Sequence, residues 1–185
     1  MRLHAEKELK SMHNHLRALI SDTGREIIEE GIDKENDLWI VRMKHGTYVV
    51  LLLHPLKQKF VIIRFVFELE DEHKKILKEN FLDPMKINEI TYGLSSAISS
   101  PYTARTLRTF ECENGQRLAI GFDVDAKTFP FDKAFSITHF DNAVQSVVSL
   151  GVLGITFMAS LLQLGEMAIK QQEVLSASSP DGMFL

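Results

Sequence analysis

The feature that most constrains this chain of 185 residues is a long stretch without charge. From Asn142 to Gly165 no side chain is charged, and Asp141 and Glu166 bound the stretch. A helix needs about 20 apolar residues to cross a bilayer. This stretch is therefore long enough to be a membrane span, a buried core helix, or a helix shared between two copies of the chain.

The spacing of polar side chains within this stretch favours a helix of a soluble protein. Asn, Gln, Ser and Thr recur mostly at steps of three and four, which places them on one stripe of a helix. The opposite side is apolar. No Lys or Arg stands next to the stretch, whereas a membrane anchor usually has flanking basic residues. If a second copy covers the apolar side, we expect the dimer interface to contain Val148, Gly151, Ile155, Ala159 and Leu162.

The rest of the chain predicts an α+β fold. The apolar spacing over residues 3–30 predicts helix with Gly31 after its last turn, either one helix kinked at Gly24 or two helices. After residue 37 the apolar period changes to two, which predicts strands, and Asn114-Gly115 between two such runs is a strong hairpin signal. The expected order is α-β-β-β-α-α-β-β-α, with strands at 38–44, 47–54, 60–69, 104–112 and 117–124, and helices at 3–30, 70–81, 83–100 and 135–175.

This order implies an antiparallel five-stranded sheet flanked by helices, made of a three-strand meander and a hairpin. We expect one domain over residues 1–175 and a flexible tail over 176–185.

The first three predicted strands show no polar face. Alternate residues of a strand point to opposite faces. The set that includes Trp39 and Val41 is apolar, and the other set is also apolar apart from a few charged residues. An antiparallel sheet with one solvated face should alternate cleanly. Either the helices predicted over residues 71–100 cover the second face, or it binds another chain. The residues expected in that partner-binding surface are Leu38, Ile40, Phe60, Ile62 and Val66.

No constellation of residues points to catalysis, a cofactor or a metal ion. His13 and His15, two apart on a predicted helix, point about 200° apart and cannot share a metal. Cys112 lies between Glu111 and Glu113, whose charges disfavour a thiolate. No glycine-rich phosphate loop or nucleophile motif occurs. We therefore predict no catalytic, cofactor-binding or metal-ligating residues.

Composition limits the kinds of partner and the cellular compartment that we expect for this protein. The net charge is −4, which gives no reason to expect nucleic acid. The single cysteine excludes an intramolecular disulfide and fits a reducing compartment, and the first residues lack the apolar core of a secretory signal. We expect a cytoplasmic protein.

The order of elements resembles the type III secretion chaperone-like fold. The stretch from EEGIDKENDLWIVRMKHGTYVVLLLHP through FVIIRFVFELEDEHKKIL to residues 117–124 also resembles a small archaeal family placed in that fold. The resemblance covers roughly residues 5–170. It is based on the pattern of elements, not on a signature motif, and it assigns no binding residue to this chain. It implies a dimer that holds an extended client segment, although this chain lacks the strong acidity of the secretion chaperones and has a more apolar last helix.

These observations together predict a non-enzymatic homodimer that holds a polypeptide partner on its sheet or in a groove. One alternative is a regulatory domain that binds a small ligand in a pocket between helix and sheet. A second alternative is a protein tethered to a membrane through residues 142–165.

Overall fold

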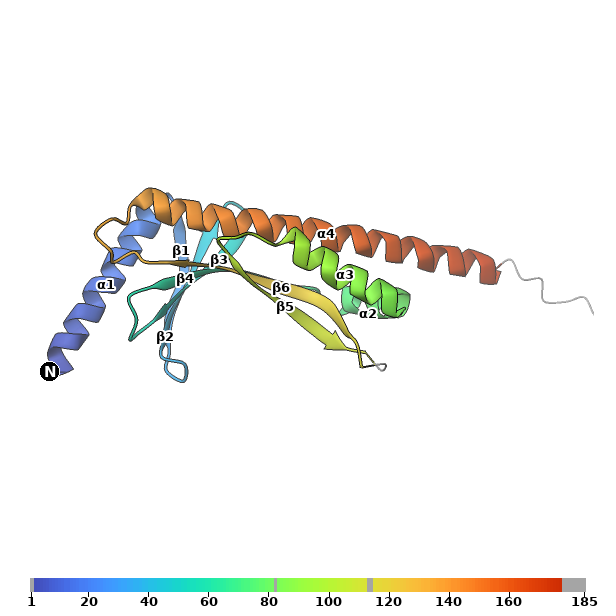
Figure 1. Ribbon diagram of the computed structural model, residues 1–185, viewed down its shortest axis with the longest axis horizontal. Coiled ribbons are helices and arrows are strands. Elements are labelled where there is room, and N and C mark those ends of the chain that lie inside the picture. Colours follow the sequence, from blue (N-terminus) through green and yellow to red (C-terminus); the bar gives the residue numbers. More distant parts are fainter. Residues whose placement is uncertain (1, 82, 113–114, 178–185) are drawn as a thin grey trace, which may run out of the picture. The chain divides into compact units, whose positions relative to one another are not determined.

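The structure is a computed structural model that describes residues 2–81, 83–112 and 115–177. It has an α+β fold with an antiparallel, open sheet of six strands and four helices (Figure 1). The strand order in the sheet is β1-β2-β3-β4-β6-β5. The elements are α1 (Arg2–Asp22), β1 (Glu26–Asp33), β2 (Leu38–His45), β3 (Tyr48–Pro55), β4 (Val61–Glu68), α2 (Asp71–Asn80), α3 (Pro84–Ala97), β5 (Ala104–Glu111), β6 (Arg117–Thr128) and α4 (Ile137–Ala177). Most of the predicted tail, from residue 178 on, lies outside the described residues.

The chain divides into two compact units, each described here by itself. Unit 1 comprises residues 1–66, 99–106 and 123–152, and unit 2 comprises residues 67–98, 107–122 and 153–185. Strands β4, β5 and β6 and helix α4 contribute to both. The prediction of a single domain over residues 1–175 stays a prediction.

One predicted element is wrong: residues 3–30 are not a single helix. Helix α1 ends at Asp22, and Gly24 follows with a left-handed φ of +71°, a conformation that glycine adopts without strain. The chain then forms β1, which pairs antiparallel with β2 from Glu26↔Lys44 to Asp33↔Leu38. Gly31 therefore lies within a strand, and the sheet has six strands instead of five. In this segment the hydrogen bonds of β1 with β2 favour a strand, although the few apolar residues have helical spacing.

The core of unit 1 lies on one face of the meander, which we call the inner face. Its residues are buried and come from alternate positions of the strands: Trp39, Val41, Met43, Val50, Leu52, Val61, Ile63 and Phe65. The register confirms that they share a face, because Val41 pairs with Leu52 and Leu52 pairs with Ile63. The sequence identified this set but did not show which of the two faces was covered.

Both helical segments of unit 1 pack on the inner face. In α1, the ring of His13 stacks on Trp39 with the centroids 4.0 Å apart. In α4, Gly151 approaches Phe65 so closely that a Cβ atom there would overlap the ring. Near the start of α4, Asp141 accepts a hydrogen bond at 2.5 Å from Arg25, whose side chain is almost fully buried. This pair ties α4 to the residues between α1 and β1.

Unit 2 follows the sequence prediction closely. Asp83 caps α3 by accepting a hydrogen bond from the Met85 amide at 2.9 Å, and Pro84 occupies the first turn. The predicted hairpin forms between β5 and β6, where the Cys112 amide donates to the Gln116 carbonyl at 2.7 Å and Gly115 has a φ of +78°.

Candidate functional site

The opposite side of the meander, the outer face, holds the residues predicted to bind a partner. We define the outer face by the following residues: Leu38, Ile40, Leu53, Phe60, Ile62 and Val66. The five that the sequence predicted are all half-buried, while Leu53 is buried between its neighbours. Ile40 pairs with Leu53, and Leu53 pairs with Ile62. These three side chains therefore form an apolar row across β2, β3 and β4, on the side away from α1 and α4.

Charged side chains around this row are engaged in pairs. Arg64 donates two hydrogen bonds of 2.7 Å to the carboxylate of Asp125 in β6. Arg42 bonds Glu29 of β1 at 3.2 Å. The Lys127 ammonium lies 3.8 Å from the centroid of the Phe60 ring. Arg42 and Arg64 flank Leu51 in the next row of the same face, so charge lies directly beside the apolar row, which itself carries none.

Strand β1 forms one edge of the sheet beside the outer face. Among the strands that the structure describes it is the first in the sheet order, so one side of its backbone has no partner strand among them. Ile28 and Ile32 are about half exposed, and a shallow hollow of about 280 Å³ lies beside Ile32, Ile40 and Arg42. A β-bulge between Ile27 and Glu29, together with the acidic side chains of β1, hinders pairing in one regular register. The outer face is therefore the more regular of these two surfaces.

The inner face contains a buried pair of histidines that the sequence did not bring together. His13 of α1 and His54 of β3 meet edge to face, with centroids 5.4 Å apart, and His13 also stacks on Trp39. His54 Nε2 lies 3.0 Å from the Gln58 carbonyl, which accepts the hydrogen bond. Within the described part of the chain, His13 Nε2 and His54 Nδ1 have no hydrogen-bond partner.

Burial disfavours the protonated form of both rings. Desolvation, and then the charge of His54, lower the pKa of His13 to about 4, and desolvation also lowers the pKa of His54. Over the residues whose side chains are described, no group of three or more His, Cys, Asp or Glu side chains comes together to hold a metal ion. The pair is a contact between α1 and the sheet. Sequence spacing could not reveal it because the two histidines come from different elements.

The predicted dimer residues of α4 divide into two groups. Val148 and Gly151 are buried inside unit 1, so they offer no surface to a second copy. Ile155 and Leu162 are half-buried and Ala159 is exposed, all in the part of α4 that belongs to unit 2. The polar stripe predicted along the helix is exposed throughout, at Asn142, Gln145, Ser146, Ser149, Thr156, Ser160 and Gln163.

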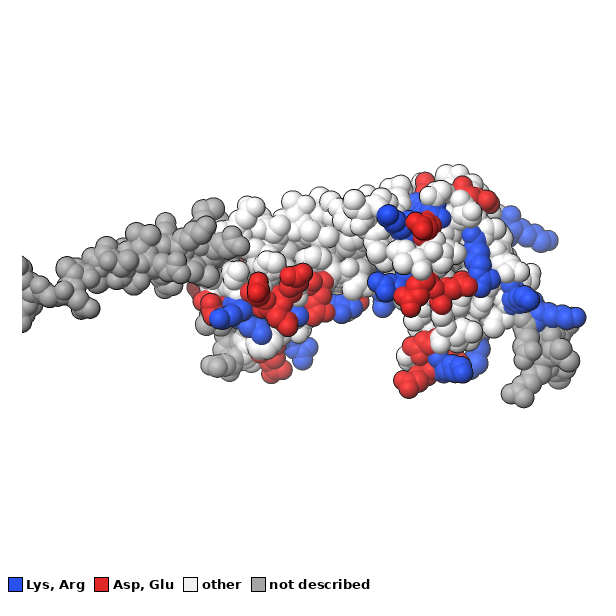
Figure 2. All heavy atoms as spheres, turned by 180° about the vertical axis from the view of Figure 1, so that it is seen from behind, with Lys and Arg blue, Asp and Glu red and all other residues white. Residues whose placement is uncertain are grey.

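Helix α4 also meets the length and composition of a membrane span. Over Ile137–Gln163 it is long and apolar enough to cross a bilayer, and 33% of its most apolar window is buried. Figure 2 shows a strip without charged side chains over the middle of this helix. Length and composition alone carry little weight here, because core helices of soluble proteins meet the same criterion.

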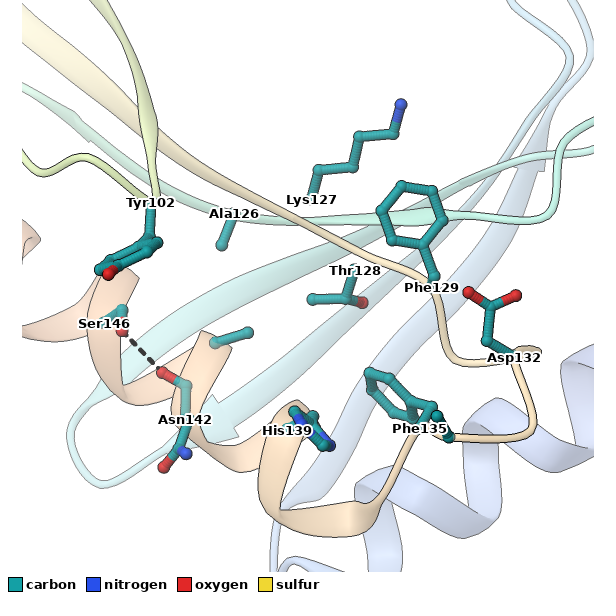
Figure 3. A pocket seen from close by; sticks show the side chains of 12 residues that line it. Tyr102, Ala126, Lys127, Thr128, Phe129, Asp132, Phe135, His139, Asn142 and Ser146 are labelled. Atoms are coloured by element: carbon teal, nitrogen blue, oxygen red, sulfur yellow. Dashed lines mark hydrogen bonds between the residues drawn. The ribbon is translucent and has the colours of Figure 1, made fainter.

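A larger hollow lies in unit 1 between β6 and the first turns of α4. It has a volume of about 630 Å³ and includes three aromatic side chains, Tyr102, Phe129 and Phe135. Figure 3 shows Ala126 and Thr128 pointing from β6 toward α4, and Lys127 pointing away. The sequence suggested a pocket between helix and sheet as an alternative but identified none of these residues. Its residues come from a strand, a loop and a helix, and no local motif marks them.

Comparison with known proteins supports the fold. A crystal structure of an uncharacterized protein from Methanothermobacter thermautotrophicus has a similar fold, with a TM-score of 0.66 at 12% sequence identity. The match covers 80% of this chain and 97% of that chain. No protein-family model and no curated protein sequence matches. The neighbour is archaeal, as the resemblance suggested, while the likeness to secretion chaperones stays a prediction.

Proposed function

We propose that this protein is a non-enzymatic binding module that holds an extended segment of another polypeptide on the outer face. The observation that carries the proposal is the apolar row Ile40, Leu53 and Ile62, which crosses three strands on the face opposite both helical segments of unit 1.

The composition of the outer face suits an extended chain. Side chains of an extended segment alternate between its two sides, so every second residue can meet the sheet. A partner with apolar residues at alternate positions would cover Leu38, Ile40 and Ile62 and remove their exposed surface from water. Each square ångström of apolar surface buried contributes about 25 cal/mol. Arg42 and Lys44, exposed at the margin, favour acidic residues on the partner.

The test is a binding screen with defined peptides. An array of extended peptides with alternating apolar residues is probed with the purified chain, and the best peptide is measured by fluorescence anisotropy. We expect Ile40→Asp and Ile62→Asp each to weaken binding at least tenfold, and Ser149→Asp, on the exposed stripe of α4, to leave it unchanged. If no peptide binds, or if both outer-face variants bind as the wild type does, the proposal is wrong.

We further propose that the protein acts as a homodimer. The support is the uncharged surface of α4, where Leu153 is 54% exposed and Ile155 and Leu162 are half-buried. Sedimentation velocity over a hundredfold range of concentration should show a dimer, and Leu153→Lys should shift it toward monomer. A wild-type chain that stays monomeric over the whole range would refute this.

For the compartment we propose the cytoplasm. Cys112 is a buried free cysteine, which is compatible with a reducing environment.

A further inference from the structure

The hollow between β6 and α4 exists because small side chains line it. Ala126 on the strand, Ala134 in the loop and Ala143 on the helix leave space that larger residues would fill. The volume of about 630 Å³ is in the range typical of small-molecule sites, about 300–1,000 Å³. All lining residues belong to unit 1, so the geometry of the hollow depends on that unit alone.

A buried hydroxyl group in this hollow has no partner. Thr128 is 8% exposed, and its Oγ1 atom makes no hydrogen bond within the described structure. A buried polar group without a hydrogen-bond partner destabilises the folded state. Figure 3 places Thr128 among the side chains of the hollow, between β6 and the helix. A ligand that forms a hydrogen bond with this hydroxyl group would remove that cost.

Aromatic rings stand at both ends of the hollow. Figure 3 shows Tyr102 at one end and Phe129 and Phe135 at the other. Such rings bind planar aromatic ligands by offset or edge-to-face contact. Two charged side chains line the hollow. The Lys127 ammonium lies 3.8 Å from the Phe60 centroid and 5.4 Å from the Phe129 centroid, and Figure 3 shows this side chain pointing away from α4, while Asp132 is exposed. A carboxylate and a free hydroxyl oxygen both accept hydrogen bonds.

We propose that this hollow binds a small planar aromatic molecule that carries an N–H donor. The ring lies between the aromatic side chains, and its N–H group donates to Thr128 Oγ1, with Asp132 favouring donors at the rim. The site adjoins the outer face, because the Phe129 ring lies 6.4 Å from the Phe60 ring between centroids, but the residues that line it are different ones.

The first experiment compares two ring compounds of nearly equal shape. Indole carries an N–H group, and indene does not. Titration of the ¹⁵N-labelled chain, followed by amide chemical shifts, should show saturable changes at residues 126–129 and 139–146. Indole should bind about tenfold more tightly than indene. The absence of saturable shifts with indole, or equal affinity for the two compounds, would overturn the proposal.

Variants then test the two features separately. Thr128→Val removes the hydroxyl group at almost constant shape and should lower the affinity for indole to that for indene, while Thr128→Ser should retain the preference. Ala143→Leu should abolish binding of both compounds by filling the space.

Matched controls lie outside the lining of the hollow. Thr103→Val removes another buried hydroxyl group that has no partner, and Ala18→Leu enlarges an exposed helical alanine. Both should bind indole as the wild type does, and thermal denaturation of every variant reports whether it is folded. Unchanged discrimination in a folded Thr128→Val variant would show that the hydroxyl group does not contact the ligand.

Discussion

The two faces of the meander in unit 1 are similar in sequence and different in structure. Ile62 and Ile63 are adjacent in β4, yet Ile63 is fully buried on the inner face and Ile62 is half-buried on the outer face. Helices α1 and α4 cover the first face, where His13 of α1 stacks on Trp39 and Gly151 of α4 lies against Phe65. Apolar composition alone therefore does not determine which side of a sheet becomes the core.

The largest difference between the faces should appear on truncating these two isoleucines. Ile63→Ala leaves a cavity in a packed core and should lower the free energy of unfolding by about 2–5 kcal/mol. Ile62→Ala removes a side chain that already touches water and should lower it by about 1 kcal/mol. Urea denaturation measures both. Equal losses would show that the outer face is packed as tightly as the inner one.

The inner face should also make stability depend on pH. The pKa of His13 is lowered to about 4 in the folded state, against an ordinary value of 6.5, so between these values the unfolded chain binds more protons. The stability contributed by neutral His13 is complete above pH 6.5 and is lost as the pH falls toward 4. The loss should be on the order of 3 kcal/mol.

His13→Phe retains the stack on Trp39 without the titration and should flatten the decline in melting temperature between pH 6.5 and 4. The control is His15→Gln, because His15 is exposed and bonds the Pro130 carbonyl at 3.0 Å. A pH profile unchanged by His13→Phe would refute the role of this ring.

Helix α4 also has one packed side and one exposed side, so the same comparison can be made within this helix. Gly151→Ala places a methyl group against the Phe65 ring and should cost about 1–3 kcal/mol by overpacking. Ser149→Ala, on the exposed stripe, should change the free energy of unfolding by less than about 0.5 kcal/mol. Thermal denaturation of the two variants measures the difference. A stabilised Gly151→Ala chain would show that Phe65 has room to move.

The smallest effect is expected at the margin of the outer face. Arg42 and Glu29 are both well exposed, so their ion pair contributes little. Arg42→Gln should lower stability by less than about 0.5 kcal/mol, and added salt should reduce that difference further. A loss above 1 kcal/mol in urea denaturation would show that the pair helps to hold β1 in the sheet.

Local signals predicted much of the fold and little of the candidate sites. Asp83-Pro84 and Gly115 specify a helix start and a hairpin through their own backbone preferences, so they could be recognised directly. Strand β1 could not, because its sequence lacks alternation and its pairing with β2 is a tertiary interaction. The outer-face residues could be named because Ile40 and Ile62 alternate with buried neighbours. Thr128, His13 and His54 could not, because their surroundings come from distant parts of the chain.

By itself, the sequence determined the α+β class, the meander, the hairpin and the polar stripe of the last helix, since each depends on periodicity or on the conformation of a few neighbouring residues. Only the tertiary structure decided where the uncharged helix packs: Val148 and Gly151 lie inside unit 1, while its polar stripe stays exposed. It also decided which face of the sheet is covered and where a hollow remains. These outcomes depend on contacts between residues far apart in the chain, such as Gly151 with Phe65, which no local pattern encodes.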